Sequence, residues 1–128
     1  MGLLLDTHVL VWALDKPERL SLSVRQELED PLNEVYFSAA SIWEIAIKSK
    51  LGKVNFRHSA EAIARGATDT GFIELPITAS HSAAVAGLPG HHRDPFDRLL
   101  VAQAMALPAH LLTVDSALVP YSDLVRCL

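Results

Sequence analysis

Short apolar runs alternate with longer amphipathic stretches along the whole chain. The apolar runs have the length of strands and lie at 2–5, 34–37, 72–75 and 111–114, with a further short one at 124–127. The stretches between them repeat apolar residues at helical spacing and predict helices at 8–14, 21–29, 39–50, 59–69, 78–86 and 94–107. Because the runs at 2–5 and 111–114 are apolar at nearly every position, we expect strands that are buried on both faces, as in a parallel sheet.

This alternation predicts an α/β fold with a central, mostly parallel sheet and helices on both of its faces. The chain has 128 residues, half of them hydrophobic, which is enough for a single domain over 1–128 with its own core. The face of the helix at 39–50 that is expected to pack inward consists of Ile42, Ile45, Ala46 and Ser49. Trp12 and Trp43 have the spacing of core aromatics on amphipathic helices, with base stacking as the alternative use of either ring.

Four acidic residues are placed where such a sheet would gather them. Asp6 and Asp115 each follow an apolar run, and ligands of open α/β sheets bind beyond the carboxyl ends of the strands. Glu44 and Asp97 lie near the starts of the two clearest helices. Two unit charges about 4 Å apart repel by roughly 1 to 4 kcal/mol at the dielectric of water or of a protein surface. A bound divalent cation is the usual compensation, and hard carboxylate ligands favour Mg²⁺ or Mn²⁺.

Each acid also has a purely structural explanation. Asp6 and Asp115 have the position of helix N-caps, because both follow a strand and precede a helical stretch. Glu44 forms a capping box with Ser41 or an i,i+4 ion pair with Lys48. If Ser38 is the cap instead, Glu44 lies in the second turn and the capping box fails.

The segment Asp94-Pro95-Phe96-Asp97 holds two acids with different expectations. Asp94 precedes a proline and is a good N-cap with Pro95 at the first helical position. Asp97 falls in the first helical turn, where the macrodipole favours a negative charge. It also shares a face with the apolar residues Leu100 and Val101, so we expect its carboxylate to point into a polar site.

Charge and cysteine usage narrow the class of protein. The formal net charge of −4 argues against a protein that coats nucleic acid through its overall charge, so local basic residues would have to hold a polyanion. Arg93 and Arg98 flank the two acids of the 94–97 segment, and Lys48 lies near Glu44; these three are the candidate contacts. With one cysteine, no signal-peptide pattern and no apolar run of membrane-spanning length, we expect a cytoplasmic protein with no membrane segment.

Four ordered motifs carry a resemblance to PIN-domain ribonucleases of the VapC toxin type. They are LLDTHVL at 4–10, SAASIWEIAIK at 38–48, HRDPFDRLLVAQA at 92–104 and LTVD at 112–115. The resemblance covers nearly the whole chain and implies a three-layer α/β/α sandwich with an acidic Mg²⁺ or Mn²⁺ site.

The same resemblance implies roles for individual residues. Asp6, Glu44 and Asp97 match the core acids, Asp115 matches the fourth and more variable one, and Thr7 would hold a ligand or water. Asp94 and Asp97 can both be matched to the third acid; Asp97 is preferred because the pattern that usually follows that acid begins there.

The resulting hypothesis is a metal-dependent endoribonuclease that hydrolyses RNA phosphodiester bonds at the four carboxylates. The resemblance further implies a toxin silenced by a small cognate antitoxin, and a homodimer. Two alternatives remain: a catalytically silent PIN-like interaction module whose acids cap helices, and a DNA nuclease.

Overall fold

A computed structural model of the chain describes residues 2–52, 58–90 and 94–128. In chain order, the strands are β1 (Gly2–Leu5), β2 (Val35–Ser38), β3 (Ile73–Leu75), β4 (Ala109–Thr113) and β5 (Val125–Cys127). The α-helices are α1 (Thr7–Asp15), α2 (Leu22–Glu29), α3 (Ala39–Lys50), α4 (Ala60–Thr70), α5 (Ala79–Ala84) and α6 (Pro95–Ala106). Single-turn and short 3₁₀ segments are η1 (Pro17–Arg19), η2 (Val85–Gly87) and η3 (Ser116–Tyr121). Across the described ranges, none of these helices is both long and apolar enough to cross a membrane.

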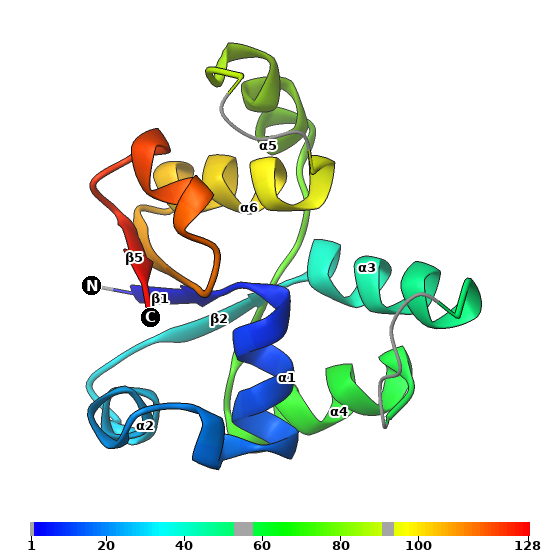
Figure 1. Ribbon diagram of the computed structural model, residues 1–128, viewed down its shortest axis with the longest axis vertical. Helices are drawn as coiled ribbons and strands as arrows, with labels where there is room; N and C mark the ends of the chain where they lie inside the picture. The colour runs from blue at the N-terminus through cyan, green and yellow to red at the C-terminus, as the bar shows by residue number, and fades with distance from the viewer. Residues whose placement is uncertain (1, 53–57, 91–93) are drawn as a thin grey trace.

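The five strands form one sheet in the order β3-β2-β1-β4-β5, and every neighbouring pair is parallel. Helices cover both faces, with α1, α2 and α4 on one side and α5 and α6 on the other (Figure 1). The predicted α/β/α sandwich with a mostly parallel sheet is therefore confirmed. All pairings are parallel because each strand is followed by a helical connection that returns the chain to the same end of the sheet.

Two hydrophobic cores lie on opposite faces of the sheet, and β1 contributes to both. Leu3 and Leu5 belong to the core beneath α1, α2 and α4, whereas Leu4 belongs to the core beneath α6. This division follows from the strand geometry, since successive side chains point to opposite faces. Cover on both faces also explains why the apolar run is uninterrupted, because neither face of the strand is exposed to solvent.

The helix α3 is rotated relative to its predicted face. Its buried residues are Ala40, Ser41, Glu44 and Ile45, while Ala46 and Ser49 are exposed. The prediction for Ala46 and Ser49 is therefore wrong, as is the prediction that Trp43 is a core aromatic, because Trp43 is 57% exposed. The rotation is permitted because the inward Glu44 is hydrogen-bonded rather than left unpartnered.

Strand β1 lies at the point where the order of the strands in the sheet reverses. The chain continues from β1 to β2 and β3 on one side, whereas β4 and β5 pair on the other side. In doubly wound sheets a crevice opens at the carboxyl end of the strands at this switch point. Asp6 follows β1 there, and its backbone N–H donates to Leu112 O of β4 at 2.9 Å.

An ion pair joins the helix α2 to the edge strand β5. Arg126 donates from both terminal guanidinium nitrogens to the two carboxylate oxygens of Glu27, at 3.0 and 2.9 Å. The hydrogen bond to Arg126 lowers the pKa of Glu27, against a smaller opposing effect of burial. Both side chains are about one-third exposed, so we expect solvent screening to limit the pair to about 1 kcal/mol or less.

We predict that Glu27→Gln lowers the free energy of unfolding at pH 7 by up to about 1 kcal/mol. Because the folded pKa of Glu27 is depressed, its contribution is complete above the unfolded pKa of roughly 4.3 and is lost as the pH falls through the lower folded value. Urea denaturation of both proteins from pH 7 to pH 3 should show the difference shrinking as the pH falls. A difference that stays constant with pH would contradict the assignment.

Candidate active site

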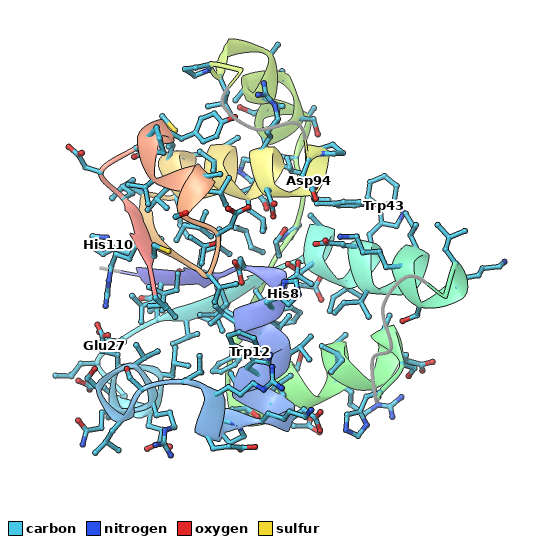
Figure 2. All side chains as sticks on the ribbon, viewed as in Figure 1. His8, Trp12, Glu27, Trp43, Asp94 and His110 are labelled. Carbon is cyan, nitrogen blue, oxygen red and sulfur yellow. The ribbon has the colours of Figure 1, made fainter. Side chains whose placement is uncertain are left out.

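A cavity of about 160 Å³ opens at the carboxyl end of the sheet, beside β1 and β4. We call it the acidic cavity, and its lining residues are Asp6, Thr7, His8, Glu44, Lys48, Asp94, Asp97, Val114 and Asp115. Figure 2 shows His8 at the start of α1 and Asp94 at the start of α6, facing this region from different elements. The four acids expected to act together therefore line one cavity, although they come from positions up to 109 residues apart in the sequence.

Two backbone N–H groups hold the carboxylate of Asp6. It caps α1 by accepting the N–H of Val9 at 2.8 Å, and its second oxygen accepts the N–H of Val114 at 3.2 Å. Burial raises the pKa of Asp6, while hydrogen bonds from Thr113, Val9 and Val114 and the charge of His8 lower it in part. The predicted cap is thus present, and the same carboxylate also bridges β1 to the end of β4.

Thr7 connects Asp6 to Glu44. Its hydroxyl donates to Glu44 Oε1 at 2.5 Å and lies 3.0 Å from Ser41 Oγ, and all three side chains are buried. Ser38 is the N-cap of α3, accepting the N–H of Ala40. Glu44 therefore lies in the second turn, and the capping box with Ser41 is not formed.

Lys48 supplies a positive charge within the acidic cavity. Its ammonium forms an i,i+4 ion pair with the other carboxylate oxygen of Glu44, as expected from the spacing. Partial burial lowers the pKa of Lys48, but the hydrogen bond to Glu44 and the charges of Glu44, Asp94 and Asp97 together outweigh this effect. The pKa of Lys48 is therefore raised above its ordinary value. Lys48 is therefore charged and stabilises the neighbouring carboxylates.

The first turn of α6 contributes two acids of different geometry. Asp94 is the N-cap: its Oδ1 accepts the N–H groups of Phe96 at 2.9 Å and Asp97 at 3.3 Å, with Pro95 at the first helical position. Asp97 lines the same cavity from within the first turn, where the helix dipole favours a carboxylate. The structural role expected of Asp94 is observed, and its side chain also lines the cavity.

Asp115 follows β4 by two residues and caps the 3₁₀ segment η3. Its Oδ1 accepts the N–H of Ala117 at 3.0 Å, and its own N–H donates to the hydroxyl of Thr113. Asp6, Asp94 and Asp115 are therefore all caps, whereas Glu44 and Asp97 occupy no N-cap position. Capping does not use all the lone pairs of a carboxylate, so a capping acid retains oxygen lone pairs for another ligand.

The oxygen-rich donor set has the chemistry of a site for a hard divalent cation. Within the described residues, no three Asp, Glu, His or Cys side chains are arranged to hold one metal ion directly. Lys48, paired with Glu44, provides the counter-charge in this geometry.

The predicted basic contacts are placed differently from one another. Lys48 lines the acidic cavity. Arg98 donates to the carbonyl oxygens of Pro89, Val85 and Leu88 and to the hydroxyl of Tyr121, so its guanidinium fastens the η2 turn and η3 to α6. This placement favours a structural role for Arg98. Arg93 lies outside the described residues.

Sequence reasoning did not assign His8 or Val114 to the site. His8 is exposed at the second position of α1, directly after the Asp-Thr pair, and that adjacency was the available signal. Val114 lies between the end of β4 and Asp115 and lines the cavity, and its backbone N–H donates to Asp6. Its role as a backbone donor has no signature in the sequence.

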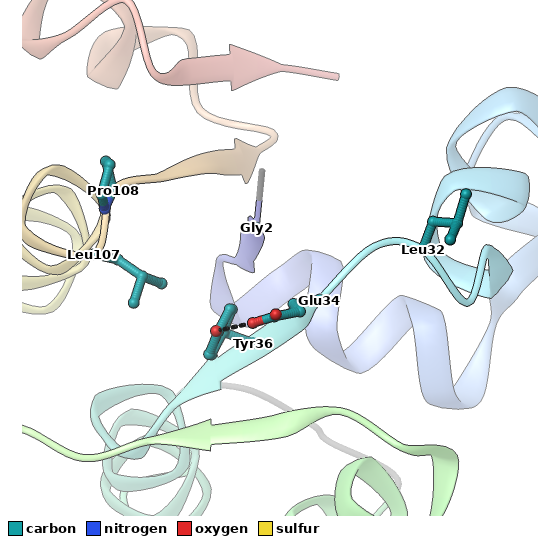
Figure 3. A pocket seen from close by; sticks show the side chains of 6 residues that line it. All are labelled: Gly2, Leu32, Glu34, Tyr36, Leu107 and Pro108. Carbon is teal, nitrogen blue, oxygen red and sulfur yellow. Dashed lines mark hydrogen bonds between the residues drawn. The ribbon is translucent and has the colours of Figure 1, made fainter.

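A separate cavity of about 220 Å³ lies at the amino end of the sheet (Figure 3). Tyr36 donates to Glu34 in its wall, and this hydrogen bond, together with burial and the charge of Glu34, raises the pKa of Tyr36. A Cβ atom on Gly2 would come within 2.9 Å of the Tyr36 ring, so the strand start is closely packed there. Because ligands of parallel sheets bind at the carboxyl edge, the acidic cavity is the better candidate site.

Comparison with protein families and solved structures agrees with this architecture. The family model described as PIN domain matches residues 3–122. Among solved structures, the chain is similar to VapBC2 from Rickettsia felis bound to a DNA fragment from their promoter, with a TM-score of 0.71 and 18% sequence identity. That match covers 99% of this chain and 98% of the other, and at this identity it shows the fold. No curated protein matches the chain significantly.

Proposed function

The chain belongs to the PIN domain family, and on that basis we propose that it is a divalent-metal-dependent endoribonuclease that acts as the toxin of a toxin–antitoxin pair. Because PIN domains are nucleases as a class, we favour phosphodiester hydrolysis over other reactions that a bound metal could catalyse. The observation that carries the proposal is the convergence of Asp6, Glu44, Asp97 and Asp115 on one cavity at the switch point of the sheet.

In this proposal Asp6 and Asp97 are the principal ligands of Mg²⁺ or Mn²⁺. Asp6 is buried and fixed by two backbone N–H groups, so its carboxylate has little freedom to reorient. Asp97 faces the same cavity from the start of α6, where the helix dipole offsets its charge. Glu44 and Asp115 would complete the site, directly or through water.

When bound, the cation would activate a water for in-line attack and stabilise the leaving 3′ oxygen, which leaves a 5′-phosphate on the product. Thr7 keeps Glu44 in place through its short hydrogen bond. Lys48 would exchange its contact with Glu44 for a phosphate oxygen of the strand, because its ammonium lies at the cavity and remains charged.

We predict that purified protein cleaves a total-RNA pool into discrete products bearing 5′-phosphates when Mn²⁺ is present, and that EDTA abolishes cleavage. Asp97→Asn should lower the rate by about 100-fold or more, since it removes several kcal/mol of charge stabilisation at the reacting phosphate. Asp94→Asn is the matched control. Asn caps a helix as well as Asp, so this variant should fold and retain activity within about tenfold.

The outcomes separate the alternatives. Equal loss in Asp94→Asn and Asp97→Asn would assign both acids to the site, and loss confined to Asp94→Asn would identify Asp94 as the third acid. Cleavage of DNA but not of RNA of the same sequence would favour a DNA nuclease. No cleavage of either by folded wild-type protein would favour the silent interaction module.

The partner in this proposal is a small antitoxin protein. The similar Rickettsia felis structure is a VapBC assembly on promoter DNA, which supports a partner of the VapB type for this chain. The same proposal includes a homodimer, which the sequence resemblance implies. It also includes a cytoplasmic location, where the RNA substrate is found.

Expression of this chain alone should slow bacterial growth, and co-expression of the small protein encoded beside it should restore growth. Asp97→Asn should not slow growth at the same expression level, which controls for toxicity unrelated to cleavage. If the neighbouring protein neither forms a complex with the chain nor restores growth, the antitoxin assignment fails.

A further inference from the structure

A further cavity, of about 310 Å³, lies beside the acidic cavity at the edge formed by α1, η1 and α2. We call it the aromatic cavity, and its lining residues are Trp12, Arg19, Leu20, Ser21, Val24, Val114 and Leu128. Its volume is at the lower limit of cavities that hold small organic ligands, which span about 300 to 1,000 Å³. The buried Leu20 and Val24 belong to the core and form an apolar wall.

The aromatic cavity lies next to the acidic cavity. Val114 lines both of them. His8 lines the acidic cavity and Trp12 lines the aromatic one, and their rings meet edge to face with centroids 6.1 Å apart. Figure 2 shows His8 near the start of α1 and Trp12 farther along the same helix. A nucleotide next to a phosphate held at the acids would therefore be close to the aromatic cavity.

Two side chains of the aromatic cavity could bind a ligand, the ring of Trp12 and the planar guanidinium of Arg19. The guanidinium carbon of Arg19 lies 5.5 Å from the centroid of the Trp12 ring, which is the geometry of a cation–π contact. Trp12 is half-buried against the core, so its ring is held rather than free to rotate. Arg19 is exposed and adds a positive charge on the path of a phosphate backbone.

We propose that the aromatic cavity is a nucleobase subsite that receives one base of the RNA strand next to the scissile phosphate. The base stacks on Trp12, and Arg19 contacts its face or the adjoining phosphate. Stacking on an aromatic ring accepts any base, whereas the walls of the cavity limit the size of the base. The assignment rests on the proposed ribonuclease function. It adds to that function a site that determines which nucleotide lies beside the cleaved bond.

An RNA base fits the observations better than an apolar peptide side chain does. The cavity adjoins the acids through Val114, and its rim has the cation Arg19 and the hydroxyl of Ser21. A phosphate-linked aromatic ligand satisfies the stacking ring and the cation together. An apolar peptide segment would use only the Leu20 and Val24 wall.

Tryptophan fluorescence reports on this subsite directly. In a Trp43→Phe background, Trp12 is the only tryptophan, because the chain has two. Titration with the RNA hexanucleotides A₆, C₆, G₆ and U₆ in EDTA, where the proposed hydrolysis cannot proceed, should quench Trp12 saturably. An abasic ribose-phosphate hexamer with the same charge should bind more weakly and leave the fluorescence nearly unchanged.

Two substitutions and a matched control test the same assignment by affinity and by cleavage. Trp12→Leu keeps an apolar side chain against the core but removes the flat ring, and it should weaken hexamer binding by about 5- to 150-fold, the range for loss of one stacked base. Arg19→Ala should weaken it at least about threefold through lost cation–π and phosphate contacts. Arg65→Ala removes an exposed arginine paired with Glu61 on α4, and should change neither binding nor cleavage.

The outcomes distinguish failure of the subsite from failure of the ribonuclease proposal. If wild-type protein cleaves RNA but Trp12→Leu and Arg19→Ala bind and cleave like Arg65→Ala, the subsite is wrong and the proposed function stands. If wild-type protein neither binds nor cleaves RNA, both fail. If the two substitutions leave RNA binding and cleavage unchanged but abolish binding of the antitoxin, the cavity holds a protein segment. The nucleobase assignment is then overturned.

Discussion

Mutual repulsion among carboxylates at the carboxyl end of the sheet is the constraint on which the rest of this structure depends. Asp6 and Glu44 are buried there, and burial of an ionised carboxylate is costly unless hydrogen bonds or opposite charges compensate it. The fold supplies that compensation from its own framework. Two backbone N–H groups bind Asp6, Thr7 and Lys48 bind Glu44, and the N-terminus of α6 faces Asp97. The caps and the site are therefore parts of one electrostatic arrangement.

Much of the architecture could be predicted because the elements have strong local signals. The Leu3-Leu4-Leu5 run requires cover on both faces, and the structure divides these side chains between two cores. The rotation of α3 could not be read in the same way. Its apolar residues occupy more than one face, and the inward position of Glu44 is stabilised by a hydrogen bond from Thr7, 37 residues away. Trp43 was assigned to the core for the same reason, because periodicity alone does not say which of two faces a tertiary contact selects.

The acids of the candidate site, their caps and the Glu44–Lys48 ion pair were predicted individually, but the contacts between distant parts of the chain that hold them were not. Positions after strands identified Asp6 and Asp115, and the Asp-Pro start of α6 identified Asp94 as its cap. The link from Val114 to Asp6 is a backbone hydrogen bond between residues 108 positions apart, which no side-chain pattern encodes. Arg98 illustrates the converse: its position beside two acids suggested a polyanion contact, whereas its guanidinium is bound to backbone carbonyls of the η2 turn.

Direct measurement of Mn²⁺ binding to the purified apo-protein tests the central claim, that these carboxylates are gathered to hold a divalent cation. Electron paramagnetic resonance of free Mn²⁺, combined with thermal unfolding, reports both occupancy and linkage to folding. The account predicts saturable binding that Mg²⁺ competes for, and a stabilisation of about 2.7 kcal/mol when free Mn²⁺ reaches 100 times its Kd. It also predicts that Asp97→Asn weakens binding at least about tenfold, while Asp94→Asn does not. Folded wild-type protein that neither binds Mn²⁺ nor gains stability from it would contradict the account. The acids would then be explained by helix capping, by the Lys48 ion pair and, for Asp97, by the dipole of α6.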